Sequence, residues 1–458
     1  MNMRKALMIL ACIVLMAGYA HAGWFLSQIR HEAASGPTAL FSIDPYTSGT
    51  LTDSVSAGTM TVVRNSLGTY SDSTGCYAVA VNTGRFDDGC IFEPAVTNTI
   101  KNSEDLTIVG VEDGDWFSGV GTGNCTITSD ATTSPLAGVN ADAICAAGTN
   151  ETHYIYTFQP ASQGDVWVSS AFLKAGVKTS AFIGITYLSA IFAPLAGGNV
   201  TIDLTTGGTS AGGATVLSAE DVGGGWYRLG IRIAAVAPAT TVYVLSSYGI
   251  VGGAYLGTGA EDLYLWGGQL EESLYLTEYV RTAGAPVTTA EEYAEINIPA
   301  AVATAVGVGQ EGTAVAKLQF SIAHSGVAGA NYCPAVGVGA STDPPMVSAG
   351  SDGTLYGVFS ADSNPTSVTV TTTWSADAVV WTGITWGSGL FRALYRKSIG
   401  DWTAGGDEAF AGFTVDGANK LVVGRKYGAN AKVPFKILEL HVWGTELSTA
   451  DLNATYGF

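Results

Sequence analysis

Neighbouring carboxylates are the groups in this sequence best suited to acid–base chemistry. A glycosidase needs two carboxyl groups about 5 to 9.5 Å apart beside the scissile bond. Adjacent residues of a strand point to opposite faces, so adjacent carboxylates cannot address one bond together. Turns exposed to solvent are therefore the better interpretation of the run Glu112-Asp113-Gly114-Asp115 and of the pairs Glu261-Asp262, Glu271-Glu272 and Glu291-Glu292.

Histidine offers little to add to these carboxylates. The sequence has five histidines and contains neither HExxH nor GxSxG. Glu439 and His441 alternate on a predicted strand, but the positions two and four residues after Glu439 carry no second carboxylate. The sequence therefore indicates a protein that is not an enzyme, with a glycan hydrolase or lyase as the open alternative.

Tryptophan provides candidate platforms for stacking on sugar rings. Gly residues flank Trp381 and Trp386 in VVWTGITWGSG, and turns at these glycines would expose both rings. Trp226 and Trp266 lie within apolar strands, where packing in a core is expected. The predicted carbohydrate-binding residues are Trp116, Trp381, Trp386 and Trp402.

Charge and the amino terminus limit the partners. The formal net charge of −19 would repel phosphate backbones, so no nucleic acid is expected. Residues 1–22 have a basic start, a short apolar run and the small residues of Ala20-His21-Ala22. This pattern is typical of a cleaved secretion signal, with an uncleaved anchor as the alternative. A secreted or extracellular location follows, and contact with a membrane is expected only through this segment.

Five cysteines remain after such cleavage. In an oxidising compartment, the simplest pairing joins residues near in sequence, which predicts the disulfides Cys76–Cys90 and Cys125–Cys145. Cys333 is then left over and is expected to be a buried apolar residue.

The elements that position these residues are short strands. Gly is abundant at 59 residues, charged residues are only 13%, and β-branched runs alternate with Gly-rich turns, all of which is typical of all-β sandwiches. The segment EDLYLWGGQLEE (261–272) has the pattern of a strand covered on both faces. Beyond it the pattern of strands restarts, so two tandem antiparallel sandwiches are expected. Ser448 and Asp451 could cap a short helix near residue 458.

Three parts of the sequence resemble known families. VVRNSLGTYSD, followed by GCYAVAVNTGRFDDGCIFEPAVTN, resembles the junction segment of phage tail-fibre and head-spike proteins, through residues that include Arg64, Thr69, Glu93 and Asn98. GGGWYRLGIRI and EDLYLWGGQLE resemble strands of carbohydrate-binding-module-like jelly rolls. FKILELHVWGTELSTADLNATY resembles the end of concanavalin A-like and laminin G-like sandwiches.

The resemblance implies a division of the chain. A signal peptide at 1–22 precedes an N-terminal junction segment at 23–100, a jelly roll at 101–285, a linker at 286–300 and a concanavalin-like sandwich at 301–458. It also implies a structural calcium ion between Glu104 and Asp262, and no other cofactor.

The function expected from these features is structural or adhesive. The resemblance implies a virion-type protein that recognises a cell-surface glycan or decorates a particle, and that assembles as a homo-oligomer on the virion surface. A secretion signal is not needed for assembly of virions in the cytoplasm, so a secreted bacterial adhesin, or a filament subunit, is the alternative.

Overall fold

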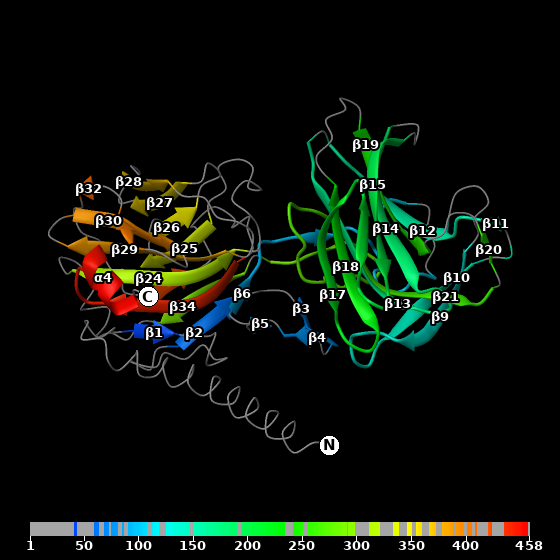
Figure 1. The fold of residues 1–458 in the computed structure, drawn as a ribbon, viewed down its shortest axis with the longest axis horizontal. Coiled ribbons are helices and arrows are strands. Elements are labelled where there is room, and N and C mark those ends of the chain that lie inside the picture. The colour runs from blue at the N-terminus through cyan, green and yellow to red at the C-terminus, as the bar shows by residue number, and fades with distance from the viewer. Residues whose placement is uncertain are drawn as a thin grey trace, which may run out of the picture.

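The computed structural model forms two antiparallel β-sandwiches in tandem, which confirms the predicted fold class (Figure 1). Among the described residues no helix is both long and apolar enough to cross a membrane. The predicted signal at 1–22 lies outside them. The structure describes residues 41–43, 59–63, 68–72, 75–80, 85–86, 90–107, 112–118, 125–146, 148, 150–162, 164–189, 194–233, 241–250, 255–257, 259–290, 292–297, 311–320, 333–338, 346–349, 354–359, 366–371, 378–387, 390–397, 401–404, 408–409, 420–423 and 435–456.

The first sandwich consists of two six-stranded sheets. We call one the β13 sheet, with the order β17-β18-β13-β21-β10-β9, and the other the β14 sheet, with the order β16-β15-β14-β19-β12-β8. A small pair, β11–β20, lies beside them. The strands are β8 (Phe117–Ser118), β9 (Cys125–Thr133), β10 (Asn140–Ala146), β11 (Asn150–Glu151), β12 (Tyr154–Pro160), β13 (Trp167–Ala175), β14 (Ser180–Ser189), β15 (Pro194–Asp203), β16 (Thr209–Gly212), β17 (Thr215–Asp221), β18 (Trp226–Ile233), β19 (Thr241–Ile250), β20 (Tyr255–Leu256) and β21 (Glu261–Glu272).

Strand β21 is buried on both faces, as its alternating pattern predicts. Leu263 and Leu265 point into the core between the two sheets. Trp266 points the other way and packs against Phe172 and Tyr279, with ring centroids 5.1 and 4.8 Å away. The outer face of the β13 sheet therefore carries a second, smaller core.

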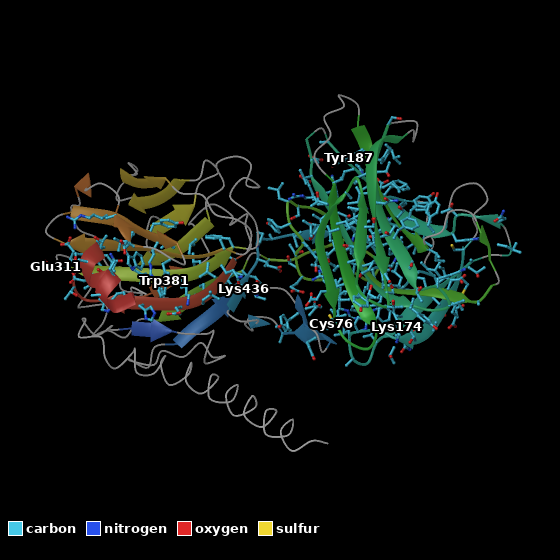
Figure 2. The ribbon with its side chains drawn as sticks, in the orientation of Figure 1. Cys76, Lys174, Tyr187, Glu311, Trp381 and Lys436 are labelled. Atoms are coloured by element: carbon cyan, nitrogen blue, oxygen red, sulfur yellow. The ribbon has the colours of Figure 1, made fainter. Side chains whose placement is uncertain are left out.

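Residues of the N-terminal segment complete this second core. The hairpin of β3 (Gly68–Asp72) and β4 (Gly75–Val79) places the buried Cys76 in the same cluster as Trp266. Figure 2 shows Cys76 at the lower edge of the first sandwich. The Thr69 hydroxyl donates a 2.6 Å hydrogen bond to the Tyr279 carbonyl oxygen. One outer face of the first sandwich is thus covered by the chain itself.

The second sandwich combines strands from both ends of the chain. One sheet has the path β31-β30-β29-β24-β34-β6-β5, with β1 also on β34 and β32 on β30; the other has the order β2-β23-β33-β25-β26-β27-β28. Its elements are β1 (Phe41–Ile43), β2 (Thr59–Val63), β5 (Arg85–Phe86), β6 (Cys90–Phe92), β23 (Tyr293–Asn297), β24 (Gly312–Phe320), β25 (Cys333–Val338), β26 (Met346–Ala349), β27 (Thr354–Phe359), β28 (Thr366–Thr371), β29 (Val379–Gly387), β30 (Leu390–Lys397), β31 (Thr403–Ala404), β32 (Glu408–Ala409), β33 (Lys420–Val423), β34 (Phe435–Trp443) and α4 (Thr449–Tyr456).

The first sandwich is therefore inserted between N-terminal and C-terminal strands of the second. Both β1 and β6 pair with β34, and β2 pairs with β23. Figure 1 shows the blue strands β1 and β6 beside the red β34. The sequence places residues 23–100 in a separate junction segment. Its exact boundaries stay a prediction. Of its described strands, β1, β2, β5 and β6 add to sheets of the later sandwich, whereas the β3–β4 hairpin packs on the first sandwich.

Helix α4 begins as its sequence predicts. The Ser448 backbone N–H donates a 2.9 Å hydrogen bond to the Asp451 carboxylate, and the Asp451 N–H donates to the Ser448 hydroxyl oxygen at 3.2 Å. This reciprocal pair is a capping box, which satisfies donors of the first helical turn. Leu447 and Leu452 are buried against the second sandwich.

Two chain segments cross together between the sandwiches, and we call residues 93–103 and 277–292 the neck. Strand β7 (Thr97–Asn98) pairs with β22 (Val287–Thr288), and the Glu93 N–H donates to the Glu292 carboxylate at 3.0 Å. The fully buried Asn98 donates from its amide to the carbonyl oxygens of Gly268 and Val280. These contacts make the neck a paired ribbon that is fixed to β21.

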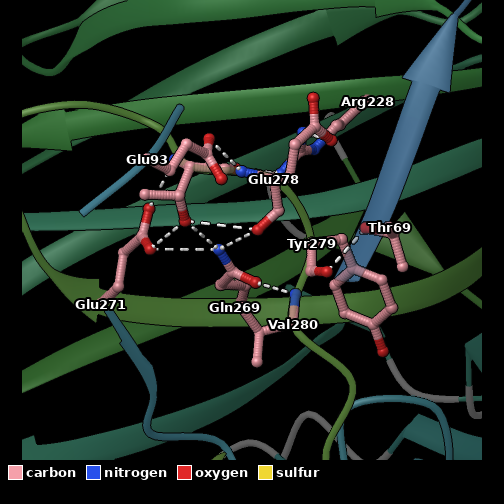
Figure 3. A network of polar contacts seen from close by, with 9 residues as sticks. Thr69, Glu93, Arg228, Gln269, Glu271, Glu278, Tyr279 and Val280 are labelled. Atoms are coloured by element: carbon pink, nitrogen blue, oxygen red, sulfur yellow. Dashed lines mark hydrogen bonds and ion pairs between the residues drawn. The ribbon is translucent and has the colours of Figure 1, made fainter. Parts of the chain in front are cut away.

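A buried polar network anchors the neck to the first sandwich (Figure 3). The Glu271 carboxylate accepts hydrogen bonds from the Thr277 hydroxyl at 2.6 Å and from the Gln269 amide at 3.1 Å. Arg228 donates to the Glu278 carboxylate at 3.1 Å, and the Glu278 N–H donates to the Glu93 carboxylate at 2.9 Å. Burial raises the pKa of Glu271 to about 7, against the opposing hydrogen bonds from Thr277.

Candidate functional site

The outer face of the β14 sheet is the candidate site. Side chains alternate along its strands, so Ile155, Ile183 and Tyr248 point into the core between the sheets. The residues between them, such as Tyr154 and Phe182, point outward and are partly exposed. The outer face of the other sheet is covered by the β3–β4 hairpin, whereas this face presents side chains to solvent.

Aromatic rings form a strip along β8 and β12 on this face. Phe117 lies between Tyr156 and Phe158, with centroid distances of 5.3 and 5.0 Å and interplanar angles of 16° and 29°. Tyr154 continues the strip at 6.2 Å from Tyr156, and Tyr243 meets Phe158 edge-on at 5.6 Å. Rings that support one another in this way form a broad apolar surface with fixed orientation.

Glycine extends this surface toward the middle of the sheet. A Cβ at Gly249 would lie 2.6 Å from Tyr154 Cβ and 2.8 Å from a ring carbon of Phe182. The absence of a side chain at Gly249 therefore lets Phe182 and Tyr154 approach from both neighbouring strands. The strip gains a sixth ring without a break in the sheet.

Polar groups follow on the side of the face opposite β8. Ser247 and Thr186 are partly exposed, and Asn199 on β15 is exposed. Their side chains form no hydrogen bond with any other described residue. Gly212 leaves room for the Asn199 carboxamide, because a Cβ there would collide with it. The face therefore combines an apolar surface with polar groups that have unused hydrogen-bonding capacity, which is the kind of lining found in ligand sites.

The tryptophans predicted to bind sugar are not on this face, and the prediction that they form stacking platforms is wrong. Trp116 is 1% exposed, lies in the core between the sheets and donates a hydrogen bond to the Asn102 carbonyl oxygen. Trp381, Trp386 and Trp402 are buried in the second sandwich, and Figure 2 shows Trp381 among its strands. A ring without exposed faces cannot stack on a sugar.

The second sandwich nevertheless brings charged groups around Trp381. Lys317 pairs directly across from Glu439 and from Trp381, and its ammonium lies 2.6 Å from the Glu439 carboxylate. His441 Nε2 lies 3.3 Å from that carboxylate, and its ring stacks on Trp381. Burial would raise the pKa of Glu439, but the contacts with His441 and Lys317 outweigh it and lower the pKa to about 2. The charges satisfy one another, which is typical of a structural ion pair.

The pair implied for calcium does not come together. Glu104 binds Arg281, and its neighbour Ser103 lies beside Gly268. Asp262 precedes Gly268 by six residues on β21, which separates the two by roughly 20 Å along an extended strand. Asp262 is buried and accepts a hydrogen bond from the Ala146 N–H. Glu104 and Asp262 are therefore too far apart to bind one calcium ion, and the site implied by the resemblance is wrong. Among the described residues no group of three or more His, Cys, Asp or Glu side chains could hold a metal ion.

Both predicted disulfides are also wrong, because Cys76, Cys125 and Cys145 are free thiols in the structure. Cys145 pairs with Thr126 across the β9–β10 hairpin, so Cys125 and Cys145 occupy opposite faces of the sheet. Cys76 packs on the first sandwich, whereas Cys90 pairs with Ile437 in the second. The side chains of Cys90 and Cys333 lie outside the description.

The signal for the aromatic strip was present in the sequence. In YIYTFQP, Tyr154, Tyr156 and Phe158 alternate and so lie on one face of a single strand. This pattern predicts a strand, but it does not predict which other rings lie beside it. Phe117 joins them because β8 pairs with β12, and 38 residues lie between the partners Phe117 and Tyr156. A pairing between strands this far apart in the sequence cannot be predicted from the residues of either strand.

No protein-family model matches the sequence, and no curated protein is significantly similar to it. Similar solved structures include the binding domain of botulinum neurotoxin serotype D, with 11% identity and a TM-score of 0.29, over 36% of this chain and 40% of that chain. Another is the binding domain of botulinum neurotoxin DC in complex with SialylT, with 9% identity, a TM-score of 0.27, and coverage of 36% and 39%. The chain thus spans about two fifths of these proteins. Likeness at this level identifies neither a family nor a ligand.

Proposed function

We propose that this chain is a non-enzymatic structural or adhesion protein that recognises carbohydrate through the outer face of its first sandwich. The observation that carries the proposal is the strip of mutually stacked rings on β8 and β12, with polar groups beside it. Phe117, Tyr154 and Phe158 are partly exposed, and the buried ring of Tyr156 supports them. Sugars present C–H faces that suit such rings and hydroxyls that suit Ser, Thr and Asn side chains.

The inserted arrangement supports the structural part of the proposal. The neck consists of two hydrogen-bonded segments, so the binding face is connected to the second sandwich by a paired ribbon instead of a single strand of chain. A particle-bound fibre or spike needs such a connection to present a binding surface at a fixed orientation. The resemblance of the segment around Thr69, Glu93 and Asn98 to phage junction segments favours a virion-type protein that works as a homo-oligomer at the virion surface.

The predicted secretion signal favours a second candidate, a secreted bacterial surface adhesin. Both candidates use the same face and the same class of ligand, so they differ in where the protein acts. Localisation of a tagged chain in its native host, in the cell envelope or in purified particles, distinguishes them.

A glycan array tests the proposed function. The wild-type protein is compared with Phe158→Ala and Phe182→Ala, which remove rings from the face. The matched control is Tyr77→Ala, because Tyr77 is 43% exposed and lies on the β3–β4 hairpin, away from the face. Binding that is lost in both face variants and kept in the control supports the proposal. Equal binding by all four proteins, or binding by none, contradicts it.

A further inference from the structure

The cross-strand register places five residues of the candidate face in one row. Phe117 lies opposite Tyr156, Tyr156 opposite Ser247, Ser247 opposite Gly184, and Gly184 opposite Asn199. Five strands at about 4.8 Å spacing make this row roughly 19 Å long. It begins at stacked rings, crosses two small residues and ends at an exposed carboxamide. A row of this length suits a chain of sugars laid across the strands better than one terminal sugar.

Charge distinguishes this face from the rest of the molecule. The chain has a net charge of −19, yet the outward side chains described on β8, β12, β19, β14 and β15 include no Lys, Arg or Glu. Among the described residues of these strands, the one outward-pointing carboxylate is Asp203, at the end of β15. Its oxygen accepts hydrogen bonds from the Thr205 backbone and hydroxyl at 2.8 and 2.6 Å. Those contacts lower the pKa of Asp203, and they use its carboxylate to stabilise the turn after β15.

The length of the row and the lack of charged side chains on it together indicate which class of sugar the face would bind. An anionic sugar needs a cation to offset the loss of its hydration, and the described part of this face offers none. The net charge of −19 on the whole chain would also repel such a sugar as it approaches. A neutral sugar loses little by leaving water for stacked rings, provided that its hydroxyls find partners.

We infer that the face binds a neutral glycan chain that lies across the strands from Phe117 to Asn199, and that it discriminates against acidic glycans. This inference rests on the proposed function. The partly exposed ring of Phe117 stacks on the chain at one end, and the buried ring of Tyr156 holds it in place. The Ser247 hydroxyl and the Asn199 carboxamide hydrogen-bond with sugar hydroxyls farther along, where neither group has a partner among the described residues.

The test uses pairs of polysaccharides that share a backbone and differ in charge. Hydroxyethylcellulose is paired with carboxymethylcellulose, and carboxyl-reduced polygalacturonate with polygalacturonate. Each polymer is immobilised, and binding of the full chain is measured at low and high salt. The variants are Asn199→Ala, Ser247→Ala and Phe158→Ala. The matched control is Thr209→Ala, an exposed residue on β16 whose partner Ile202 belongs to the inner face.

We expect the neutral member of at least one pair to bind more tightly than its acidic counterpart, with little dependence on salt. Asn199→Ala and Ser247→Ala should each weaken binding about fivefold, the loss of roughly one neutral hydrogen bond, and Thr209→Ala should not. Tighter, salt-sensitive binding of the acidic members that Phe158→Ala abolishes would overturn this inference and leave the proposed function standing. Binding to no polymer in either pair would overturn both.

Discussion

The carboxylate of Glu271 accepts a 2.6 Å hydrogen bond from the hydroxyl of Thr277, and neither side chain has appreciable contact with solvent. Glu271 lies at the end of β21 and Thr277 lies in the neck, so this bond joins the first sandwich to the ribbon that leaves it. The nearest cation of the network, Arg228, is bound to Glu278 and to the Thr277 carbonyl oxygen. A carboxyl group buried in this way is more stable when it is protonated.

We therefore expect stability to fall between pH 4.5 and about 7. The pKa of Glu271 is about 7 in the folded protein and 4.5 ordinarily, so its contribution is fully present below pH 4.5 and is lost as pH rises through 7. The difference is worth up to about 3 kcal/mol. Glu271→Gln should flatten the dependence of the denaturation midpoint on pH. Glu439→Gln is the control, because the lowered pKa of Glu439 acts only at more acidic pH. An unchanged slope in Glu271→Gln would contradict this account.

We expect the second sandwich to require its N-terminal strands. A chain that begins at Tyr293 lacks β1, β2 and β6, so the edge of β34 and one edge of β23 lose their partners. Unpaired strand edges invite aggregation. Such a fragment should be insoluble or lack a cooperative unfolding transition, whereas the full chain should unfold cooperatively. Circular dichroism during a thermal melt distinguishes them, and a cooperative melt of the shorter fragment would refute the prediction.

The comparison of sequence and structure separates local from long-range information. The cap of α4 and the two-sided burial of β21 follow from patterns within about a dozen residues, and both were predictable. The pairing of β1 and β6 with β34 joins residues more than 300 positions apart, and nothing in either segment specifies its partner. Glu93 and Asn98 form hydrogen bonds in the neck with residues more than 150 positions away, and the local pattern around them does not specify those partners.

The tryptophans were misjudged for a related reason. Glycine near Trp381 and Trp386 suggested turns, but Gly383 lies within β29, where a Cβ would collide with the Ala314 carbonyl oxygen on the neighbouring strand. The glycine allows close approach of two strands instead of ending one. The same residue type at Gly249 makes room for rings on the candidate face. Composition alone does not separate these two uses.

We expect substitution of the buried tryptophans to affect folding instead of ligand contact. Trp116→Ala and Trp386→Ala remove rings that are 1% exposed, and each should lower the free energy of unfolding by about 3 to 5 kcal/mol. Phe182→Ala, on a partly exposed ring, should cost clearly less. Urea denaturation followed by tryptophan fluorescence or circular dichroism measures the difference. A tryptophan variant with the wild-type midpoint and no glycan binding would restore that residue as a ligand platform.

Cys76, Cys125 and Cys145 form no disulfide, so we expect that a reducing agent does not shift the thermal midpoint through any of them. All three are buried thiols, and burial raises the pKa of Cys125 to about 12, so the reactive thiolate is scarce in the folded state. Alkylation without prior reduction should therefore label all three after unfolding and leave Cys125 nearly unlabelled before it. Peptide mass spectrometry reads both states. A Cys125–Cys145 cross-linked peptide would mean that the β9–β10 register differs from the one that separates these two side chains across the sheet.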